Sequence, residues 1–437
     1  MPSPPSPADR NGFHLAIICA LPIESDAVSL LFDEIFERSY GRENGDTNIY
    51  TTGRIGTHAV VLLLLPEMGT NSAAACARSL QSSYINIKLA LLVGVCGALP
   101  HISGHDAFLG DVIISESIVN YDYGRQYPNK FVVRPKEGTL GQPNKYIRGL
   151  LKSFQGDLGL GCLQRTAVAK LAFLQAKAIE EKRRTKYTPP PDETDKMFPP
   201  DYKHMHYKND CDDCYASFCE AASLLSCNDL GCELSLCASR QNRKQERPTK
   251  FVPRIFLGSI ACGNTLMKSG EHRNAVAKEH NVIAFEMEGA GVWSEVPCII
   301  VKGICDYADS HKNKEWQAFA AATAASVAVA ILGIYEVPGS TTLNHDRSGF
   351  EPNPQDHILH GSTSNFRDHK AGNYIPTCYR CGILGHIAPR CYASDRTVET
   401  EREKRYEYGE CVNCGSAEHW WRKCDHKLYE PLDDYLV

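Results

Sequence analysis

Apolar runs alternate with amphipathic stretches from Phe13 to about Val337. Five apolar runs have the length of buried strands: "FHLAIICAL", "HAVVLLLLPEM", "IKLALLVGVCGAL", "GDVIISESIV" and "CIIVKGICDYAD". Three further stretches predict helices: "IESDAVSLLFDEIF", "NSAAACARSLQSSY" and "EWQAFAAATAASVAVAILGIY". Apolar strands separated by helices indicate a central sheet covered on both faces, so the predicted fold class is α/β.

Two stretches interrupt this alternation and divide the chain. Residues 176–250 are rich in Pro, charge and Cys, and we expect them to form a long insertion in a domain of residues 13–337. Residues 338–372 are too poor in apolar residues for a core and predict a linker. The remaining expected parts are a flexible tail (1–12), a first small module (373–392), a linker (393–410), a second module (411–424) and a tail (425–437).

Composition and charge narrow the function classes. The net charge of −5 over 437 residues gives no whole-chain field that favours nucleic acid or a membrane. The N-terminal residues show no leader pattern, and we expect no apolar run of about 18 residues, the length that a membrane span needs. We therefore expect an intracellular protein, cytoplasmic or nuclear. Twelve of its 19 Cys residues fall at 211–237 or 378–424, partly in C-x2-C pairs, which favour metal over disulfides in a reducing compartment.

Two short motifs near the C-terminus predict zinc sites. Both have the spacing C-x2-C-x4-H-x4-C, the first in "CYRCGILGHIAPRC" and the second in "CVNCGSAEHWWRKC". Three thiolates and one imidazole close a tetrahedral zinc site, and segments this short need the metal to fold. We expect two structural zinc ions, one held by Cys378, Cys381, His386 and Cys391 and the other by Cys411, Cys414, His419 and Cys424.

Both motifs resemble zinc knuckles of the retroviral nucleocapsid type. That resemblance implies that Tyr379, Ile387 and Trp420 stand where bases would stack. The expected partner is single-stranded RNA or DNA. Because some knuckles bind only proteins, a protein partner remains the alternative.

Acidic residues mark the strand ends of the predicted sheet. Glu24 follows the first strand, Gly94 to Ala98 end another, Asp306 ends a third, and Glu288 opens a helix in "EGAGVW". Ligands of open α/β sheets bind beyond the carboxyl ends of the strands, so these elements are expected to form one acidic pocket. Cleavage of a ribosyl–base bond needs a proton donor, acceptors for the ribose hydroxyls and a base, and carboxylates can fill all three roles.

The motifs "FEMEGAG", "GICDYADSHKNKEWQAFAAATAA", "VGVCGA" and "GDVIIS" resemble the nucleoside phosphorylase/nucleosidase superfamily. Residues 13–337 look most like its fungal branch, which often occurs beside NTPase and repeat domains. The resemblance implies a three-layer αβα fold with a central mixed sheet and a purine nucleoside or nucleotide as substrate. Members of the family commonly complete their pockets across a subunit interface, so a homo-oligomer is expected.

The same resemblance implies roles for individual residues. Met287 would line the ribose, Glu288 would accept hydrogen bonds from its hydroxyls, and Asp306 would hydrogen-bond or protonate the purine N7. The other residues expected to line the substrate are Val95, Cys96, Gly97 and, in a supporting position, Glu286.

Hydrolysis is favoured over phosphorolysis by two departures from the phosphorylase pattern. The first turn, "CALPIESDA", has no Gly or Arg for phosphate, and Leu92 and Val95 stand where an Arg and a hydroxyl residue would be. The turn instead resembles that of methylthioadenosine nucleosidases, which implies that Glu24 activates water. The alternatives are a phosphorylase with an atypical phosphate site and a catalytically silent nucleotide-sensing or RNA-binding protein.

Six Cys residues lie in the insertion between positions 211 and 237. The resemblance to relatives with a Cys pair in this region suggests an additional zinc site on Cys211 and Cys214, with His204 and His206 just before them. The spacing does not identify the other ligands. The alternative is a helix-rich segment with free buried thiols.

Overall fold

The computed structural model describes residues 5–133, 139–140, 143–216, 218–238 and 251–338 of the chain. The linker after residue 338, both predicted knuckles with all their zinc and base-stacking residues, and the tail at 425–437 lie outside these residues. Within the expected N-terminal tail, a short 3₁₀ helix η1 (Arg10–Gly12) is present, and the Tyr40 hydroxyl donates to the carbonyl of Pro7 at 3.1 Å.

Ten strands of the described residues form one mixed sheet, in the order β11-β8-β12-β13-β5-β1-β4-β3-β2, with β14 pairing to both β5 and β8. The strands are β1 (Leu15–Cys19), β2 (Glu34–Ile35), β3 (Tyr50–Ile55), β4 (His58–Leu64), β5 (Leu89–Ala98), β8 (Val112–Asn120), β11 (Thr139–Leu140), β12 (Ile255–Cys262), β13 (Val282–Glu286) and β14 (Cys298–Asp306). The expected α/β class with a central mixed sheet is confirmed.

Part of this sheet closes on itself. Strand β5 pairs in parallel with β14 and antiparallel with β13, while β8 pairs in parallel with β12 and antiparallel with β14. Because β12 also pairs with β13, the five strands form a ring. Strands β1, β5 and β14 are parallel neighbours, so their carboxyl ends meet at one edge of the sheet. That edge carries the turn with Glu24 and the end of β14 with Asp306.

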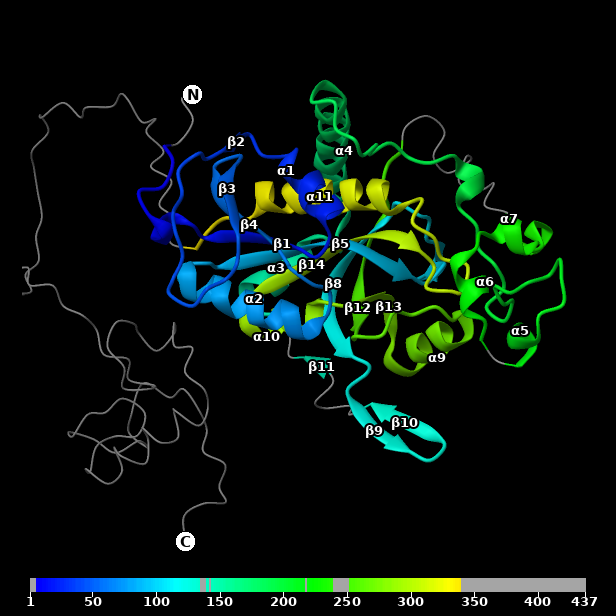
Figure 1. Ribbon diagram of the computed structural model, residues 1–437. Helices are drawn as coiled ribbons and strands as arrows, with labels where there is room; N and C mark the ends of the chain where they lie inside the picture. Colours follow the sequence, from blue (N-terminus) through cyan, green and yellow to red (C-terminus); the bar gives the residue numbers. More distant parts are fainter. Residues whose placement is uncertain (1–4, 134–138, 141–142, 217, 239–250, 339–437) are drawn as a thin grey trace, which may run out of the picture. The chain divides into compact units, whose positions relative to one another are not determined.

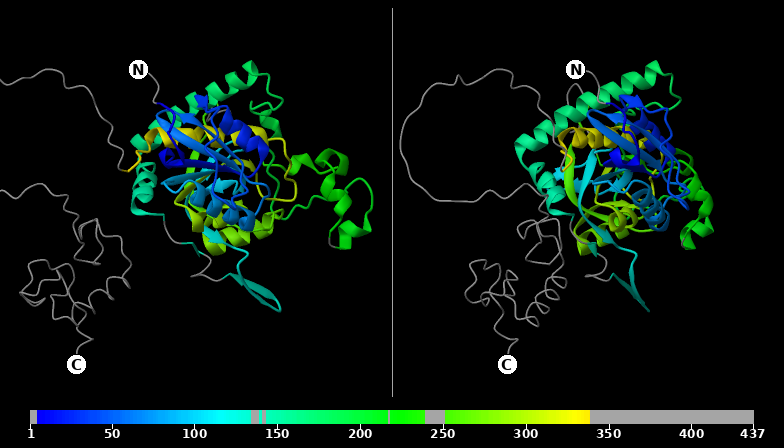
Figure 2. Two further views of the ribbon diagram at one scale, coloured as in Figure 1. Left: turned by 60° about the vertical axis from the view of Figure 1, so that its left-hand side comes forward. Right: turned by 90° about the vertical axis from the view of Figure 1, so that its left-hand side faces the viewer.

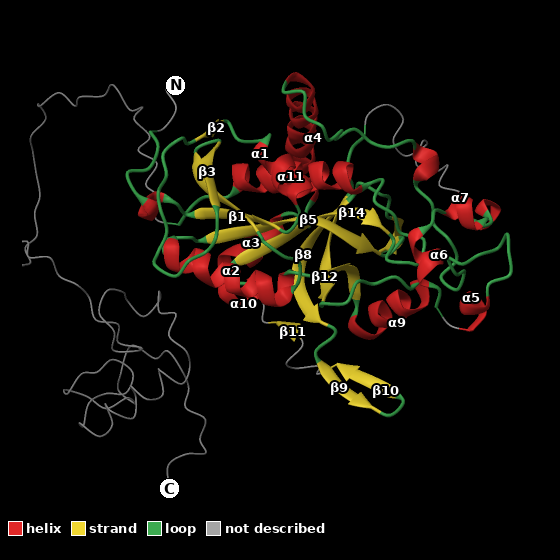
Figure 3. Cartoon of the chain, in the orientation of Figure 1, coloured by secondary structure: helices red, strands yellow, loops and turns green. Residues whose placement is uncertain are grey.

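Helices cover both faces of the sheet, which gives three layers (Figures 1 and 3). One face carries α1 (Pro22–Ser29), α4 (Asp157–Glu180) and α11 (Gln317–Ile334), and the other carries α2 (Thr70–Ser83), α9 (Gly270–His280) and α10 (Gly289–Glu295). The turned views in Figure 2 show the same layering, with α4 running along the outside of α11.

Helix α11 is the most deeply buried helix of the domain. All its residues from Phe319 to Leu332 are buried, because it packs against β14 and β5 on one side and α4 on the other. It is also the one helix in the described residues that is long and apolar enough to cross a membrane by length and composition. The expectation that no run reaches that length was therefore wrong, and burial in the domain explains the composition of this helix.

The helix predicted from "IESDAVSLLFDEIF" was wrong in its second half. Helix α1 ends at Ser29, and Glu34–Ile35 instead pairs with β3 as strand β2. Leu30, Leu31 and Phe32 are buried in succession, which a helix with one apolar face cannot achieve. The Phe32 ring occupies the space where Gly53 lacks a side chain.

Smaller elements surround the sheet. Helix α4 continues to Glu180, so the insertion begins later than the predicted residue 176. The hairpin of β9 and β10 projects from the domain (Figure 1). The insertion contains the short helices α5, α6 and α7. The smaller elements are β6 (His101–Ile102), β7 (His105–Asp106), β9 (Gly124–Tyr127), β10 (Lys130–Val133), α3 (Lys145–Ser153), η2 (Asp192–Thr194), α5 (Asp212–Ala216), α6 (Glu220–Leu224), α7 (Cys227–Leu230) and η3 (Leu234–Leu236).

The contact between β14 and α11 gives a test of the packing. A methyl group at Gly303 would overlap the backbone of Ala320, so α11 would have to move away from the sheet. We expect Gly303→Ala to lower the free energy of unfolding by about 1–3 kcal/mol, as overpacking does. The control is Gly333→Ala in α11, where no atom lies within 4 Å of the added methyl group. Urea unfolding of both variants measures the difference, and equal stability would contradict the tight contact.

Candidate active site

Glu24 is held at the first turn of α1 by backbone amides. Its Oε2 accepts hydrogen bonds from the amides of Ala20 and Leu21, both at 2.9 Å, and its Oε1 accepts from the amide of Val95 at 2.8 Å. The local sequence explains this position. Pro22 begins the helix, and a Glu two residues later can turn back to the N-cap amide of Leu21.

Strand β5 leaves space for this carboxylate at Gly94. Gly94 lies against Glu24, whose carboxylate fills the space that a side chain at position 94 would take. Glu24 is 2% exposed. Burial raises the pKa of Glu24, and the Lys302 ammonium and the backbone amides offset only part of that rise. A carboxylate whose pKa is moved toward neutral is suited to act as a general base.

Glu286 ends β13, and Glu288 is the N-cap residue of α10. Both oxygens of Glu286 accept from the amide of Gly289, at 3.0 and 2.9 Å, and Oε2 also accepts from the amide of Glu288 at 3.1 Å. Glu286 therefore accepts from amides at the N-terminus of a helix. The Cys262 thiol accepts from the next amide, that of Ala290, at 3.1 Å. Glu288 Oε1 accepts from the amide of Gly69 at 3.3 Å.

Lys302 joins these carboxylates, and the sequence analysis missed it. Its Nζ lies 3.3 Å from Glu288 Oε2 and 3.6 Å from Glu286 Oε2, and the residue is 1% exposed. Burial lowers the pKa of Lys302, but the neighbouring carboxylates of Glu288, Glu286 and Glu24 raise it by more, so the lysine is charged. The available signal was a lone basic residue within the apolar strand "CIIVKGIC".

The register of the sheet explains why Lys302 reaches this site. Lys302 on β14 is the direct neighbour of Gly94 on β5, the position occupied by the Glu24 carboxylate. Glu24, Glu286 and Glu288 thus surround one buried ammonium. Three carboxylates against one ammonium leave two formal negative charges, an environment that disfavours an anionic ligand.

Asp306 forms a second charged group at the end of β14. Its Oδ2 lies 3.0 Å from the Nζ of Lys312, and its Oδ1 accepts from the amide of Ala308 at 2.8 Å. Gly97 allows this approach, because a methyl group there would lie 2.7 Å from Oδ1. Burial lowers the pKa of Lys312, but Asp306, Cys305 and Asp309 together raise it by more, which keeps the ammonium charged. Lys312 is a further site residue that sequence reasoning missed.

A cavity of about 330 Å³ lies beside Asp306. One side is formed by β14 and the loop after it, with Asp306 and His311, and the other by the insertion, with Phe198, His204 and Cys227. Among the described residues, neither Glu24 nor Glu288 lines this cavity. The structure therefore brings Glu24, Glu286 and Glu288 together around Lys302, and it places Asp306 in a neighbouring group.

The last residues of β5 lie between the two groups. Burial raises the pKa of the Cys96 thiol. The charge of Lys302 lowers this pKa and that of Asp306 raises it. Val95 is half-buried, and its amide is engaged by Glu24. Met287 is half-buried as well. Leu92 is fully buried within β5 and belongs to the hydrophobic core.

Removal of the Lys302 ammonium should destabilise the protein. Lys302→Met leaves buried carboxylates without their cation, which typically costs about 3–5 kcal/mol. Burial already raises the pKa of Glu24 and Glu286 in the folded state, and loss of the ammonium raises it further. A folded state that binds protons more tightly loses stability as pH rises. The deficit in unfolding free energy should therefore grow from pH 5 to pH 8.

Urea unfolding at several pH values measures this deficit. The matched control is Lys278→Met on the exposed surface of α9, which should behave like the wild type at every pH. A Lys302→Met deficit that does not change with pH would contradict the charge cluster.

Comparisons with known proteins agree with this architecture. The family profile described as the Phosphorylase superfamily matches residues 14–334, and the profile described as Zinc knuckle matches residues 376–391. A relative from Hyaloscypha variabilis, named a nucleotide-binding leucine-rich repeat (NLR)-like protein, is 31% identical over 323 residues. That match covers 72% of this chain and 29% of the relative, so the chain spans less than a third of the relative's length.

The chain also matches two solved structures at low identity. The native futalosine hydrolase of Helicobacter pylori shares 15% identity at a TM-score of 0.42, covering 74% of this chain and 99% of that one. The Streptococcus pneumoniae MTA/SAH nucleosidase, in complex with 8-aminoadenine, shares 16% identity at a TM-score of 0.42, covering 73% of this chain and 99% of that one. With a family profile matched over most of its length, the chain belongs to the phosphorylase superfamily and carries a C-terminal zinc knuckle.

Proposed function

We propose that residues 13–337 form an N-ribohydrolase that cleaves the N-glycosidic bond of a purine nucleoside or nucleotide. The family membership supports a nucleoside as the substrate class. The observation that carries the choice of reaction is the Glu24 carboxylate, fixed by three amides at the strand edge with a raised pKa.

Glu24 is the proposed general base. A carboxylate offers about four lone-pair positions, and backbone amides occupy three of those of Glu24, which leaves one for a water molecule. In the proposed step the water gives a proton to Glu24, and its oxygen bonds to the ribose C1′. The bond from C1′ to the purine nitrogen breaks, and its electron pair leaves with the base.

Asp306 and Glu288 complete the proposed reaction. Asp306, in its acid form, gives its proton to the leaving purine, and the Lys312 ammonium at 3.0 Å stabilises the Asp306 carboxylate that this leaves. The proton that Glu24 takes from water balances the proton that Asp306 gives up. Glu288 accepts hydrogen bonds from the ribose hydroxyls, held in place by the amide of Gly69 and by Lys302. Met287 is proposed to contact the rest of the substrate together with Val95, Cys96 and Gly97 of β5.

Hydrolysis is favoured over phosphorolysis by the charge of the site. A phosphate dianion would need unpaired cations or several donors, because burying it without them is costly. Lys302 already faces two carboxylates, and Leu92 lies in the core, where it cannot contact a ligand at the strand edge. A phosphorylase with an atypical phosphate site is the alternative within the same family.

A second candidate function is nucleotide sensing without turnover. One observation favours it: Glu24, Glu288 and Asp306 are at most 5% exposed, so a ligand must open the site before it can react. The NLR-like name of the relative is compatible with such a role. Ligand binding with no release of base would establish it.

Replacing Glu24 should separate these functions. We expect Glu24→Gln to lower turnover about 100-fold or more, because it removes the base and keeps the shape. The measurement is chromatography of free base and sugar from a panel of purine nucleosides and nucleotides. Asp26→Asn, the same chemical change on the exposed side of α1, is the matched control and should keep wild-type turnover. Full activity of Glu24→Gln would remove Glu24 from the mechanism.

The C-terminal module is proposed to bind single-stranded nucleic acid. Its two donor sets, each of three Cys and one His, fit structural zinc, and the knuckle profile matches the first of them. Zinc would fold each motif and so present Tyr379, Ile387 and Trp420 to the bases. The second motif rests on its spacing alone.

Base stacking on Trp420 can be tested in the full chain. Stacking on an aromatic side chain contributes about 1–3 kcal/mol per base. We therefore expect Trp420→Ala to weaken binding of a single-stranded RNA oligonucleotide by about 10-fold, measured by fluorescence anisotropy. Trp421→Ala, in the same motif, is the control and should have a smaller effect. No RNA binding by the wild type would contradict the proposal and leave a protein partner for the module.

A further inference from the structure

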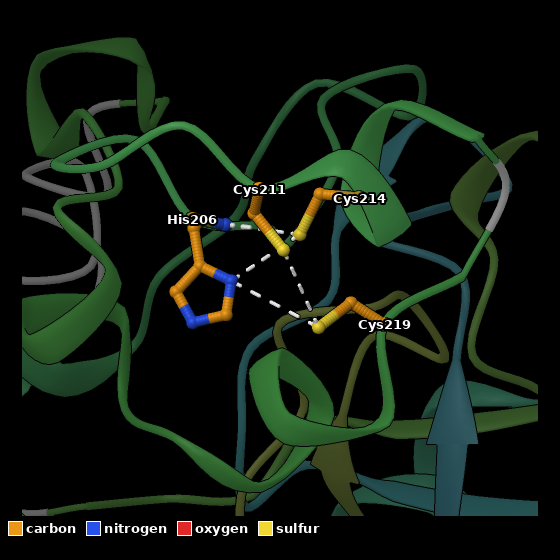
Figure 4. A group of neighbouring side chains, drawn as sticks. All are labelled: His206, Cys211, Cys214 and Cys219. Carbon is orange, nitrogen blue, oxygen red and sulfur yellow. Dashed lines mark hydrogen bonds between the residues drawn. The ribbon is translucent and has the colours of Figure 1, made fainter.

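The insertion brings four metal-binding side chains to one point. His206, Cys211, Cys214 and Cys219 direct their ligand atoms toward one another (Figure 4), and all four atoms lie within 4.8 Å of each other. We propose that these residues bind a structural zinc ion through one imidazole nitrogen and three thiolates.

The distances fit a tetrahedral ion. Zinc lies about 2.3 Å from sulfur and about 2.0–2.1 Å from nitrogen, so two ligands of one tetrahedral ion stand roughly 3.5–3.8 Å apart. The Sγ atoms of Cys211 and Cys219 are 3.8 Å apart. Nδ1 of His206 lies 3.3 Å from the Sγ of Cys214 and 3.9 Å from that of Cys219. The four donors therefore already have the spacing of a coordination shell.

The short elements of the insertion explain why a metal would be needed there. Helices α5, α6 and α7 have five, five and four residues, whereas isolated helices shorter than about 12 residues are marginal in water. The local core contains six buried residues: Phe198, Cys214, Cys219, Ala222, Leu230 and Cys232. Half of that core is cysteine. Zinc would supply folding energy that so small a core lacks.

A second group in the insertion has an independent sign of metal binding. Nδ1 of His204 lies 3.8 Å from the Sγ of Cys227 and 3.6 Å from that of Cys232. Nε2 of the same ring hydrogen-bonds to the carbonyl of Leu225 at 3.0 Å. Zinc-binding histidines characteristically donate their other ring nitrogen to such an acceptor, which fixes the tautomer.

We infer that this group holds a second zinc ion. Its three protein ligands leave a fourth position, which a water molecule can fill. His204 and Cys227 also line the cavity beside Asp306, so this ion would stabilise the wall that the insertion contributes to that cavity. The insertion also packs on the loop after β14, because the Phe198 ring stacks on His311 with a centroid separation of 3.8 Å.

Zinc content of the full chain tests both sites. We expect Cys211→Ser/Cys219→Ser to lose one zinc equivalent per chain relative to the wild type, and Cys227→Ser/Cys232→Ser to lose one as well. Cys162→Ser, the same change at a half-buried thiol on α4 outside both groups, should lose none. Each proposal is overturned if its double variant, measured by plasma mass spectrometry, retains the wild-type zinc content.

Alkylation of the wild-type protein tests the sites without relying on variants that fold. With zinc bound, Cys211, Cys214 and Cys219 should resist iodoacetamide, and they should react after treatment with a chelator. Cys227 and Cys232 should behave in the same way, whereas Cys162 should react in both states. Peptide mass spectrometry gives the extent at each residue. The first site would be overturned if Cys211 were alkylated as fast as Cys162 before the chelator is added. A Cys211–Cys219 disulfide in the isolated protein would also overturn it.

Discussion

The buried ammonium of Lys302 is the constraint on which the site depends. Carboxylates as deeply buried as Glu24, Glu286 and Glu288 would be neutral or unstable without a cation among them. The ammonium holds the turn after β1, the start of α10 and strand β14 in one arrangement. Because Lys302 is already paired with these carboxylates, its ammonium is not available to bind phosphate. One ion cluster thus links the stability of the domain to the proposed choice of water as the nucleophile.

The sequence predicted the elements that have one clear pattern. The apolar runs of β1, β4, β5, β8 and β14 were found, and the Ala-rich run of α11 was found as a helix. The pattern failed after Ser29, where tertiary packing of Phe32 overrides a helical period. The ring of five strands could not be anticipated, because strand β5 pairs with β13 and β14 through contacts that are distant along the chain.

The candidate site was predicted in part for the same reason. Glu24, Glu288 and Asp306 stand at strand ends and in family motifs, so their positions could be inferred. Lys302 lies inside an apolar strand, and only the register with Gly94 shows that it reaches the carboxylates. In the insertion, the family resemblance suggested Cys211 and Cys214, with His204 and His206 just before them, but only the fold shows that His206 and Cys219 lie beside this pair. Partners chosen by the fold rather than by spacing are the ones that sequence reasoning misses.

In the proposed reaction water, not phosphate, attacks the ribose. Turnover of a purine nucleoside in ¹⁸O-labelled water, with and without inorganic phosphate, tests it most directly. We expect one solvent-derived ¹⁸O at C1 of the released sugar, measured by mass spectrometry under conditions that trap the sugar before exchange. We also expect an initial rate that phosphate does not change. Ribose 1-phosphate free of ¹⁸O at the bridging position, formed at a rate that saturates with phosphate, would contradict it.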